Sequence, residues 1–142
     1  MKMPPFRYEK ARDLADLFAI WERAGDEARL LAGGQSLLAT LAFRLSEPSV
    51  LIDISGLAEL QGVSEGTDHL RIGAGVRHVQ LGDNALVRRH APLLAKAVPL
   101  IAHPAIRNRG TLGGSLAFAD PAAELPACAV ALGATLILAG AS

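Results

Sequence analysis

Apolar residues recur near the start of the chain with the spacing of a helix. Between residues 11 and 23, Leu14, Leu17, Phe18 and Trp21 follow an i, i+3, i+4, i+7 pattern with charged residues between them. This pattern is typical of an amphipathic helix with one buried face.

A short apolar run, a glycine pair and a second apolar run follow. Residues 28–32 and 50–52 predict two strands, and residues 36–45 between them predict a helix. Strand, glycine turn, helix and strand form a βαβ unit, which implies parallel strands and a right-handed crossover. A ligand of such a unit is expected beyond the carboxyl end of its first strand.

The pattern changes after residue 53. Residues 60–63 and 70–74 predict an antiparallel pair of strands. The remainder predicts helices over 79–87, 93–101 and 121–131, a polar loop over 103–109 and a last strand over 135–138. We therefore expect an α+β fold of two parts: residues 1–53, a small parallel βαβ subdomain, and residues 54–142, a second, partial subdomain with a mainly antiparallel sheet and helices.

Composition narrows the class of protein. The 142 residues are 51% hydrophobic and carry a formal net charge of zero, so the basic surface of a nucleic-acid-binding protein is absent. The single cysteine, Cys128, excludes an internal disulfide framework and an iron–sulfur cluster held by this chain alone. The longest apolar run, 127–139, is too short to span a bilayer, and the first residues lack the apolar core of a secretion signal. We expect a cytoplasmic protein without membrane insertion.

Two glycine pairs carry the candidate chemistry. The first stands in Ala32-Gly33-Gly34-Gln35-Ser36-Leu37 and the second in Thr111-Leu112-Gly113-Gly114-Ser115. Glycine adopts positive φ and has no Cβ, so backbone N–H groups at such turns approach an anion closely, and a following helix adds its unpaired first N–H groups. Ser36 and Ser115 would cap these helices or donate hydroxyl hydrogen bonds. Each pair taken alone is also compatible with a simple tight turn.

Other signals are weak. Gly73-x-Gly75 has His78 where a dinucleotide fingerprint requires a third glycine, so we do not assign it to nucleotide binding. The four histidines have no metal-binding spacing, and neither glycine pair has the Lys-Ser/Thr ending of a Walker loop. We assign no catalytic residue and no metal ligand.

The two glycine motifs, with residues 107–109 before the second and Asp120-Pro121-Ala122-Ala123-Glu124 after it, resemble the FAD-binding medium subunit of molybdenum hydroxylases, the carbon monoxide dehydrogenase and xanthine dehydrogenase family. The resemblance extends over the whole chain. It implies an FAD-binding type-2 fold, of the vanillyl-alcohol-oxidase or PCMH type, with FAD between two subdomains.

The resemblance also implies roles for individual residues. Residues 32–37 would contact the FAD diphosphate from one side, and Thr111, Gly113, Gly114 and Ser115 from the other. Glu124 would meet polar atoms of the sugar or ribityl region, and Ile101 would lie near the isoalloxazine.

The implied function is electron transfer within a complex. Electrons would leave a molybdopterin large subunit, cross two 2Fe–2S clusters of a small subunit and pass through FAD to an external acceptor, and the FAD subunit would only bind and tune the flavin. Alternatives are a self-contained flavin oxidoreductase of the same fold and a truncated, non-catalytic nucleotide-binding module. Two departures are noted: Phe118 stands where many relatives have His, and the C-terminal domain usual in the family is expected to be missing.

Overall fold

The computed structural model describes residues 2–141. The chain divides into two compact units, the first comprising Met1–Glu59 and Leu138–Ser142 and the second comprising Leu60–Ile137. Each unit has its own sheet and its own helices. The assignment of residues 1–53 and 54–142 to subdomains of a flavin-binding domain stays a prediction.

The first unit contains a three-stranded parallel sheet. Its strands are β1 (Arg7–Lys10), β2 (Ala28–Leu31) and β3 (Val50–Asp53), in the order β1-β3-β2. Every residue of the central strand β3 is buried, whereas three of the four residues of β1 and two of the four residues of β2 are exposed. The predicted parallel pairing of β2 with β3 is confirmed, with Leu31 opposite Asp53.

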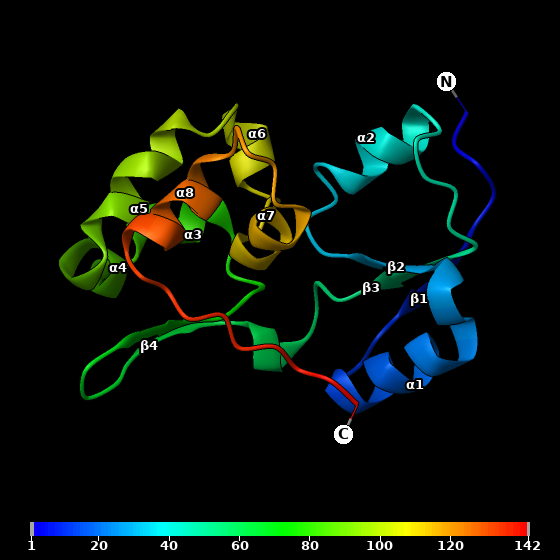
Figure 1. Cartoon of the computed structure of the whole chain (residues 1–142), viewed down its shortest axis with the longest axis horizontal. Coiled ribbons are helices and arrows are strands. Elements are labelled where there is room, and N and C mark those ends of the chain that lie inside the picture. The colour runs from blue at the N-terminus through cyan, green and yellow to red at the C-terminus, as the bar shows by residue number, and fades with distance from the viewer. Residues whose placement is uncertain (1, 142) are drawn as a thin grey trace. The chain divides into compact units, whose positions relative to one another are not determined.

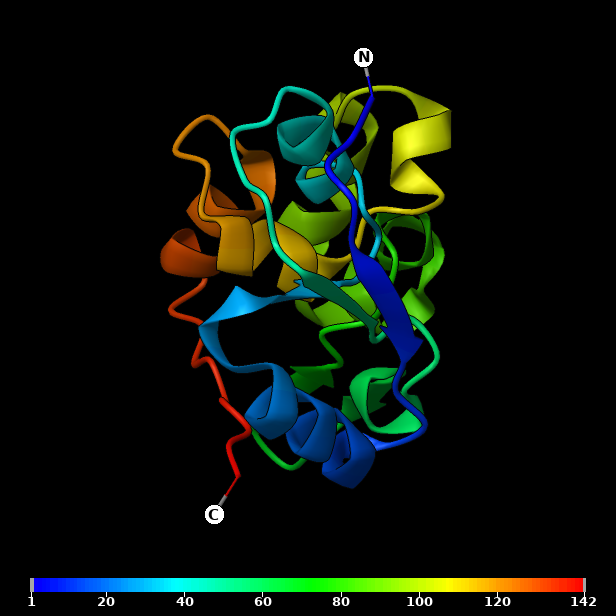
Figure 2. The ribbon, with the colours of Figure 1, turned by 90° about the vertical axis from the view of Figure 1, so that its right-hand side faces the viewer.

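Two helices connect these strands and lie on opposite sides of the sheet (Figures 1 and 2). They are α1 (Leu14–Ala24), which a short 3₁₀ turn, η1 (Gly25–Glu27), joins to β2, and α2 (Leu37–Ala42). In the sheet order β1-β3-β2, the connection from β1 to β2 moves across the sheet past β3. The connection from β2 to β3 moves back across the sheet in the opposite direction. Right-handed crossovers therefore require the two helices to lie on opposite faces.

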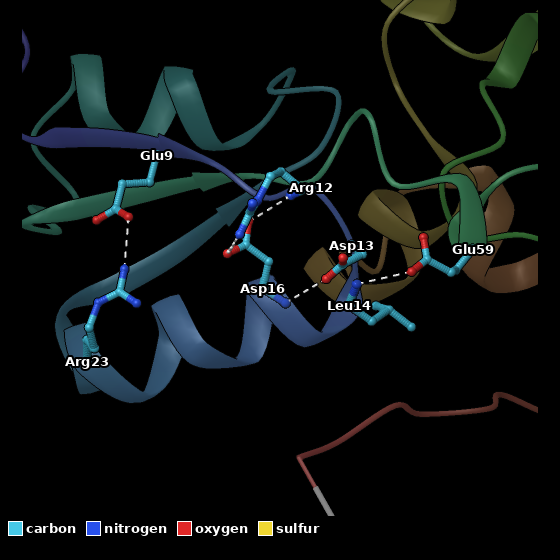
Figure 3. Close-up of polar contacts among 7 residues, drawn as sticks. All are labelled: Glu9, Arg12, Asp13, Leu14, Asp16, Arg23 and Glu59. Atoms are coloured by element: carbon cyan, nitrogen blue, oxygen red, sulfur yellow. Dashed lines mark hydrogen bonds and ion pairs between the residues drawn. The ribbon is translucent and has the colours of Figure 1, made fainter.

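Polar side chains fix the beginning of α1 (Figure 3). The Asp13 carboxylate accepts a hydrogen bond from the Asp16 N–H at 2.7 Å, as an N-cap residue does. The Leu14 N–H donates to the Glu59 carboxylate at 3.1 Å, and Arg12 pairs with Asp16. These contacts place the N–H groups of Leu14 and Asp16, and with them the positive end of the helix dipole, next to carboxylates.

The second unit combines a β-hairpin with short helices. The hairpin pairs β4 (Val63–Glu65) with β5 (Leu70–Ile72) in antiparallel register, as predicted. The helices gather on one side of it (Figure 1). They are α3 (His78–Asp83), α4 (Ala85–His90), α5 (Pro92–Ala97), α6 (Pro104–Arg107), α7 (Leu112–Phe118) and α8 (Glu124–Ala131), with the 3₁₀ turn η3 (Val98–Leu100) after α5. A further 3₁₀ turn, η2 (Ala58–Leu60), precedes the hairpin in the chain and includes Ala58 and Glu59 of the first unit and Leu60, the first residue of the second.

One hydrophobic core holds these helices together. Its completely buried members are Leu81 of α3, Val87 of α4 and Leu125 of α8, and Val63, Leu70 and Ile72 of the hairpin pack against it. Because the helices are short, their stability comes from this shared core rather than from helix propensity.

Several predicted elements are corrected. The predicted helix over 79–87 is two helices, because the Asn84 side chain accepts hydrogen bonds from the N–H groups of Leu86 and Val87 and begins α4. The predicted loop over 103–109 contains the short helix α6, and the helix predicted from Pro121 begins at Glu124.

The predicted strand over 135–138 is not formed. Those residues have no regular secondary structure and are exposed, and within residues 2–141 no strand pairs with them. A strand without a hydrogen-bonded neighbour is not stable in water. Within the same residues, no helix is both long enough and apolar enough to cross a membrane.

The buried central strand generates the first prediction. Ile52 is completely buried in β3, and its partner Leu30 in β2 is 41% exposed. Replacing Ile52 by alanine should lower the free energy of unfolding by about 2–5 kcal/mol, because it leaves a cavity. Leu30→Ala, the matched control in the same ladder, should cost less than about 1 kcal/mol. Urea unfolding followed by circular dichroism measures both. Equal losses would contradict the assigned core.

Candidate functional site

The first glycine loop, residues 32–37, leaves the carboxyl edge of the parallel sheet. It follows β2 directly, and the next residue after β3, Ile54, donates its N–H to the Leu31 carbonyl at 3.0 Å. The loop therefore begins beside the carboxyl end of the buried central strand. This is the edge at which parallel sheets bind ligands.

Gly34 requires glycine for two reasons. Its φ is +74°, in the left-handed region that side chains disfavour. A Cβ there would also lie 3.1 Å from Leu38 Cδ1 and 3.2 Å from Leu31 Cδ1. The loop path consequently depends on this residue, as its sequence predicts.

The backbone donors of the first glycine loop are available. Within the first unit, and among its described residues, the N–H groups of Gly33, Gly34 and Gln35 donate no hydrogen bond, although the Gly34 carbonyl accepts from the Leu38 N–H at 3.1 Å. The Gln35 side-chain amide donates to the Gly33 carbonyl at 3.0 Å, which stiffens the turn. Such unpaired donors at a glycine turn are suited to an anion.

Ser36 and Leu37 complete this loop. Ser36 occupies the N-cap position of α2 but its side chain makes no capping hydrogen bond, so of the two roles expected for it the cap is not formed. Ser36 is exposed. Leu37, the first residue of α2, and Ala32, at the other end of the loop, are both half-buried. The Ser36 hydroxyl is thus left to another partner.

Asp53 lies at the carboxyl end of β3 and had no predicted role. It is buried and accepts hydrogen bonds from the Tyr8 hydroxyl and from the Ser55 N–H, the latter at 2.8 Å. Burial alone would raise the pKa of this carboxyl, but the hydrogen bonds from Tyr8 and Ser55 outweigh it and the pKa lies below its usual value. The ionised Asp53 fixes the turn after β3, whose Ile54 N–H donates to the residue that precedes the first glycine loop.

The second glycine motif, residues 111–115, has a different geometry from the first. Thr111 is the buried N-cap residue of α7, and Gly113 and Gly114 lie inside the first turn of that helix rather than in a turn before it. Ser115 follows them within the helix and is not a cap. The expectation of a second glycine turn followed by a helix is therefore wrong in this detail.

The N–H groups of the second motif already have acceptors. Leu112 donates to the Val76 carbonyl at 2.9 Å and Gly113 to the Ala74 carbonyl at 2.8 Å. Gly114 donates to the Thr111 hydroxyl at 3.1 Å. The unpaired first-turn donors expected from sequence are not present, because the neighbouring segment 74–76 takes two of them and the cap takes the third.

Close packing explains several glycines of the second unit. A Cβ on Gly113 would lie 2.5 Å from Ala74 Cβ and 2.8 Å from the Ala74 carbonyl oxygen. Gly73 and Gly75 lie similarly tightly against residues 60–61, and the Gly75 N–H donates to the Leu60 carbonyl at 2.7 Å. The Gly-x-Gly that is not a nucleotide fingerprint therefore has a packing role.

The two remaining predicted site residues lie beside the core of the second unit. Ile101, just after η3, is 8% exposed and belongs to the same buried cluster as Leu112 and Leu125. Glu124 is the half-buried first residue of α8, where a carboxylate is favoured by the helix dipole. Ile101 therefore contributes to the hydrophobic core, and Glu124 to the stability of α8.

His78 is the residue that sequence reasoning missed in this unit. Its ring is buried and its Nε2 lies 3.0 Å from the carbonyl oxygen of Thr111. In the sequence, His78 is notable only because it stands where a dinucleotide-binding fingerprint would have its third glycine.

An open surface pocket of about 480 Å³ lies elsewhere in the second unit, lined in part by Asp83, Arg88 and Lys96. None of the predicted cofactor-binding residues lines it. Among residues 2–141, no group of three or more His, Cys, Asp or Glu side chains is arranged to hold a metal ion.

Comparison with known proteins identifies the family. Residues 4–142 match the family model described as the FAD binding domain in molybdopterin dehydrogenase. The chain belongs to this family, and its α+β architecture is that of the FAD-binding fold.

Curated relatives agree with this assignment. The chain is 44% identical over 134 residues to the 6-hydroxypseudooxynicotine dehydrogenase complex subunit alpha of Paenarthrobacter nicotinovorans, covering 94% of this chain and 45% of that protein. It is 39% identical to the carbon monoxide dehydrogenase medium chain of Hydrogenophaga pseudoflava, covering 96% of this chain and 48% of that one. The chain thus spans about half the length of these relatives.

Solved structures share the fold. A structure of carbon monoxide dehydrogenase from Hydrogenophaga pseudoflava superposes with a TM-score of 0.90 at 40% identity, over 92% of this chain and 46% of that chain. Quinoline 2-oxidoreductase from Pseudomonas putida 86 gives a TM-score of 0.85 at 44% identity, over 89% of this chain and 44% of that chain.

The tight contact at Gly113 generates the second prediction. Gly113→Ala should lower the free energy of unfolding by about 1–3 kcal/mol, because the added Cβ overpacks the contact with Ala74. Adding Ala74→Gly should restore only part of the loss, since the Ala74 carbonyl oxygen also stands 2.8 Å from the new Cβ. Urea unfolding of both variants measures this. A single variant as stable as the parent, or a complete rescue, would contradict the packing.

Proposed function

We propose that this chain binds FAD as part of the flavoprotein subunit of a molybdenum-containing hydroxylase or dehydrogenase. The observation that carries the proposal is the first glycine loop, whose unpaired N–H groups and positive φ at Gly34 suit a phosphate. Its place at the carboxyl edge of a parallel sheet, in a chain of this family, supports the same conclusion.

The first glycine loop fits the FAD diphosphate better than the second motif does. In our proposal the N–H groups of residues 33–35 bind the phosphate oxygens and the Ser36 hydroxyl adds a further donor. Ala32 and Leu37 hold the ends of the loop. Gly34 allows the positive φ on which the turn depends, and Gly33 adds no side chain to it.

The second motif has a more limited part in the proposal, because its backbone donors are already used. Thr111, Gly113 and Gly114 form a close-packed backbone surface for the cofactor, and Ser115 contributes its hydroxyl. Glu124 accepts hydrogen bonds from hydroxyls of the sugar or ribityl region, and Ile101 supports an apolar surface for the isoalloxazine. The chain's own residues therefore bind and orient, and none is proposed as catalytic.

The proposed complex follows from the relatives, which are described as a subunit or chain of dehydrogenases. The chain would hold the flavin between the 2Fe–2S clusters of a small subunit and an external electron acceptor, with molybdopterin in a large subunit. FAD supplies the chemistry of exchanging electrons singly or in pairs. Such a complex would be cytoplasmic.

The third prediction tests the first glycine loop. Gly34→Val should raise the Kd for FAD at least about tenfold, which corresponds to ~1.4 kcal/mol, because its side chain crowds Leu31 and Leu38 and strains the turn that holds the donors. Gly25→Val is the matched control in the same unit, since Gly25 also has positive φ, +61°, with no atom within 4 Å of an added Cβ. Its Kd should stay within about twofold of the parent value. Titration followed by flavin fluorescence measures both.

Two outcomes would overturn the placement. The first is an unchanged Kd for Gly34→Val in a folded protein, and the second is an equal loss in the Gly25→Val control. The partner proposal has its own test: copurification should recover subunits that carry molybdenum and 2Fe–2S clusters, detected by metal analysis and electron paramagnetic resonance. Recovery of a flavin-loaded protein that associates with neither would contradict it.

A further inference from the structure

His78 ties two distant segments of the second unit together. Residues 74–78 and 110–113 run antiparallel, with a bridge between Arg77 and Thr111. The His78 N–H donates to the Gly110 carbonyl at 2.9 Å, next to the hydrogen bonds that Leu112 and Gly113 donate to residues 76 and 74. The second glycine motif is therefore fixed along its backbone by this segment.

The His78 ring closes the end of this bridge. Its Nε2 lies 3.0 Å from the Thr111 carbonyl oxygen, and the ring lies flush against Gly110, where an added Cβ would stand 2.7 Å from Cε1 and 2.9 Å from Nδ1. Only glycine at position 110 leaves room for this ring. The imidazole thus holds the residue that caps α7 and, through it, the direction of the helix that carries Gly113, Gly114 and Ser115.

The contacts determine the protonation state of the ring. A carbonyl oxygen only accepts, so Nε2 carries the proton. Nδ1 is then the bare nitrogen, and among the described residues it is buried with no hydrogen-bond partner. A proton on Nδ1 would be a buried donor with no acceptor, which is costly, so the packed state requires the neutral ring.

The charged groups around the ring do not reverse this preference. Burial lowers the pKa of His78, and it outweighs the Thr111 carbonyl and the negative charge of Glu124 on α8, which both raise it. The elements packed against α3 carry Arg88, Arg89 and His90 on α4, Lys96 on α5 and Arg107 on α6, and α3 itself carries Asp83, next to Arg77. All of these side chains except the half-buried Arg107 are exposed, and burial remains the dominant influence on the pKa of His78.

We infer that His78 is a positioning residue for FAD: its neutral ring, through the Thr111 carbonyl and Gly110, sets the surface that the second glycine motif presents to the cofactor. This inference rests on the proposed function. The inference attributes the positioning of the second glycine motif to the hydrogen-bond donor at Nε2 of His78, and not simply to the volume of the side chain.

The variants separate these two contributions. His78→Gln keeps a donor near the position of Nε2, whereas His78→Met keeps an apolar side chain of similar length without a donor. Val87→Ala is the control, because Val87 is completely buried in the same core but lies on α4, outside the bridge. Gly110→Ala should also break the hydrogen bond between the ring and Thr111, because its Cβ displaces the His78 ring although the histidine itself is unchanged.

FAD titration at pH 7.5 should show a Kd raised roughly fivefold to tenfold for His78→Met and for Gly110→Ala, the range expected for one lost hydrogen bond. The Kd for His78→Gln and for Val87→Ala should stay within about twofold of the parent. If His78→Met does not fold, Gly110→Ala and His78→Gln still decide the outcome.

A pH profile of stability provides a readout independent of FAD. Because the folded-state pKa of His78 is lowered, the unfolded chain binds a proton first as the pH falls below about 6.5. Stability should therefore fall between pH 7.5 and 5.5, and it should fall less in His78→Gln, which does not titrate. Urea midpoints of the two proteins at both pH values measure the difference.

The outcomes distinguish this inference from the proposed function. If the parent does not bind FAD, the proposed function fails and the inference fails with it. If the parent binds FAD and His78→Met or Gly110→Ala binds equally well, only the inference is overturned. It is also overturned if His78→Gln loses as much affinity as His78→Met, or if Val87→Ala does, or if the pH profiles of parent and His78→Gln coincide.

Discussion

Backbone N–H groups at a turn or helix start need acceptors, and the two glycine motifs of this chain meet that need in opposite ways. In the first glycine loop the N–H groups of Gly33, Gly34 and Gln35 have no acceptor within their own unit, among its described residues. In the second motif the donors of Leu112, Gly113 and Gly114 all have one. One motif thus offers donors to an anion, and the other is a rigid surface whose position depends on the segment that carries His78.

Much of the fold could be predicted from apolar periodicity. The helix α1 and the parallel β2–β3 pair have strong patterns, because each buries one face or a whole strand. The edge strand β1 was missed, since it is mostly exposed and has no alternating apolar residues. The strand expected over 135–138 did not form, because an apolar run specifies a strand only when a neighbour supplies its hydrogen bonds.

Only part of the candidate site could be predicted from the sequence. The glycine pair 33–34 was expected to make use of positive φ, and Gly34 has it. Nothing in the residue pattern indicates that segment 74–78 occupies the donors beside Gly113, because that contact joins residues more than thirty positions apart. For the same reason His78 looked like a failed fingerprint, and only its contact with Thr111 reveals what it does.

Amide hydrogen exchange with and without FAD, followed residue by residue by nuclear magnetic resonance, tests the central claim most directly. Without FAD, the amides of Gly33, Gly34 and Gln35 should exchange rapidly while those of Leu112 and Gly113 are already protected. Adding FAD should protect the amides of the first glycine loop. Unchanged rapid exchange in that loop under saturating FAD would contradict the account.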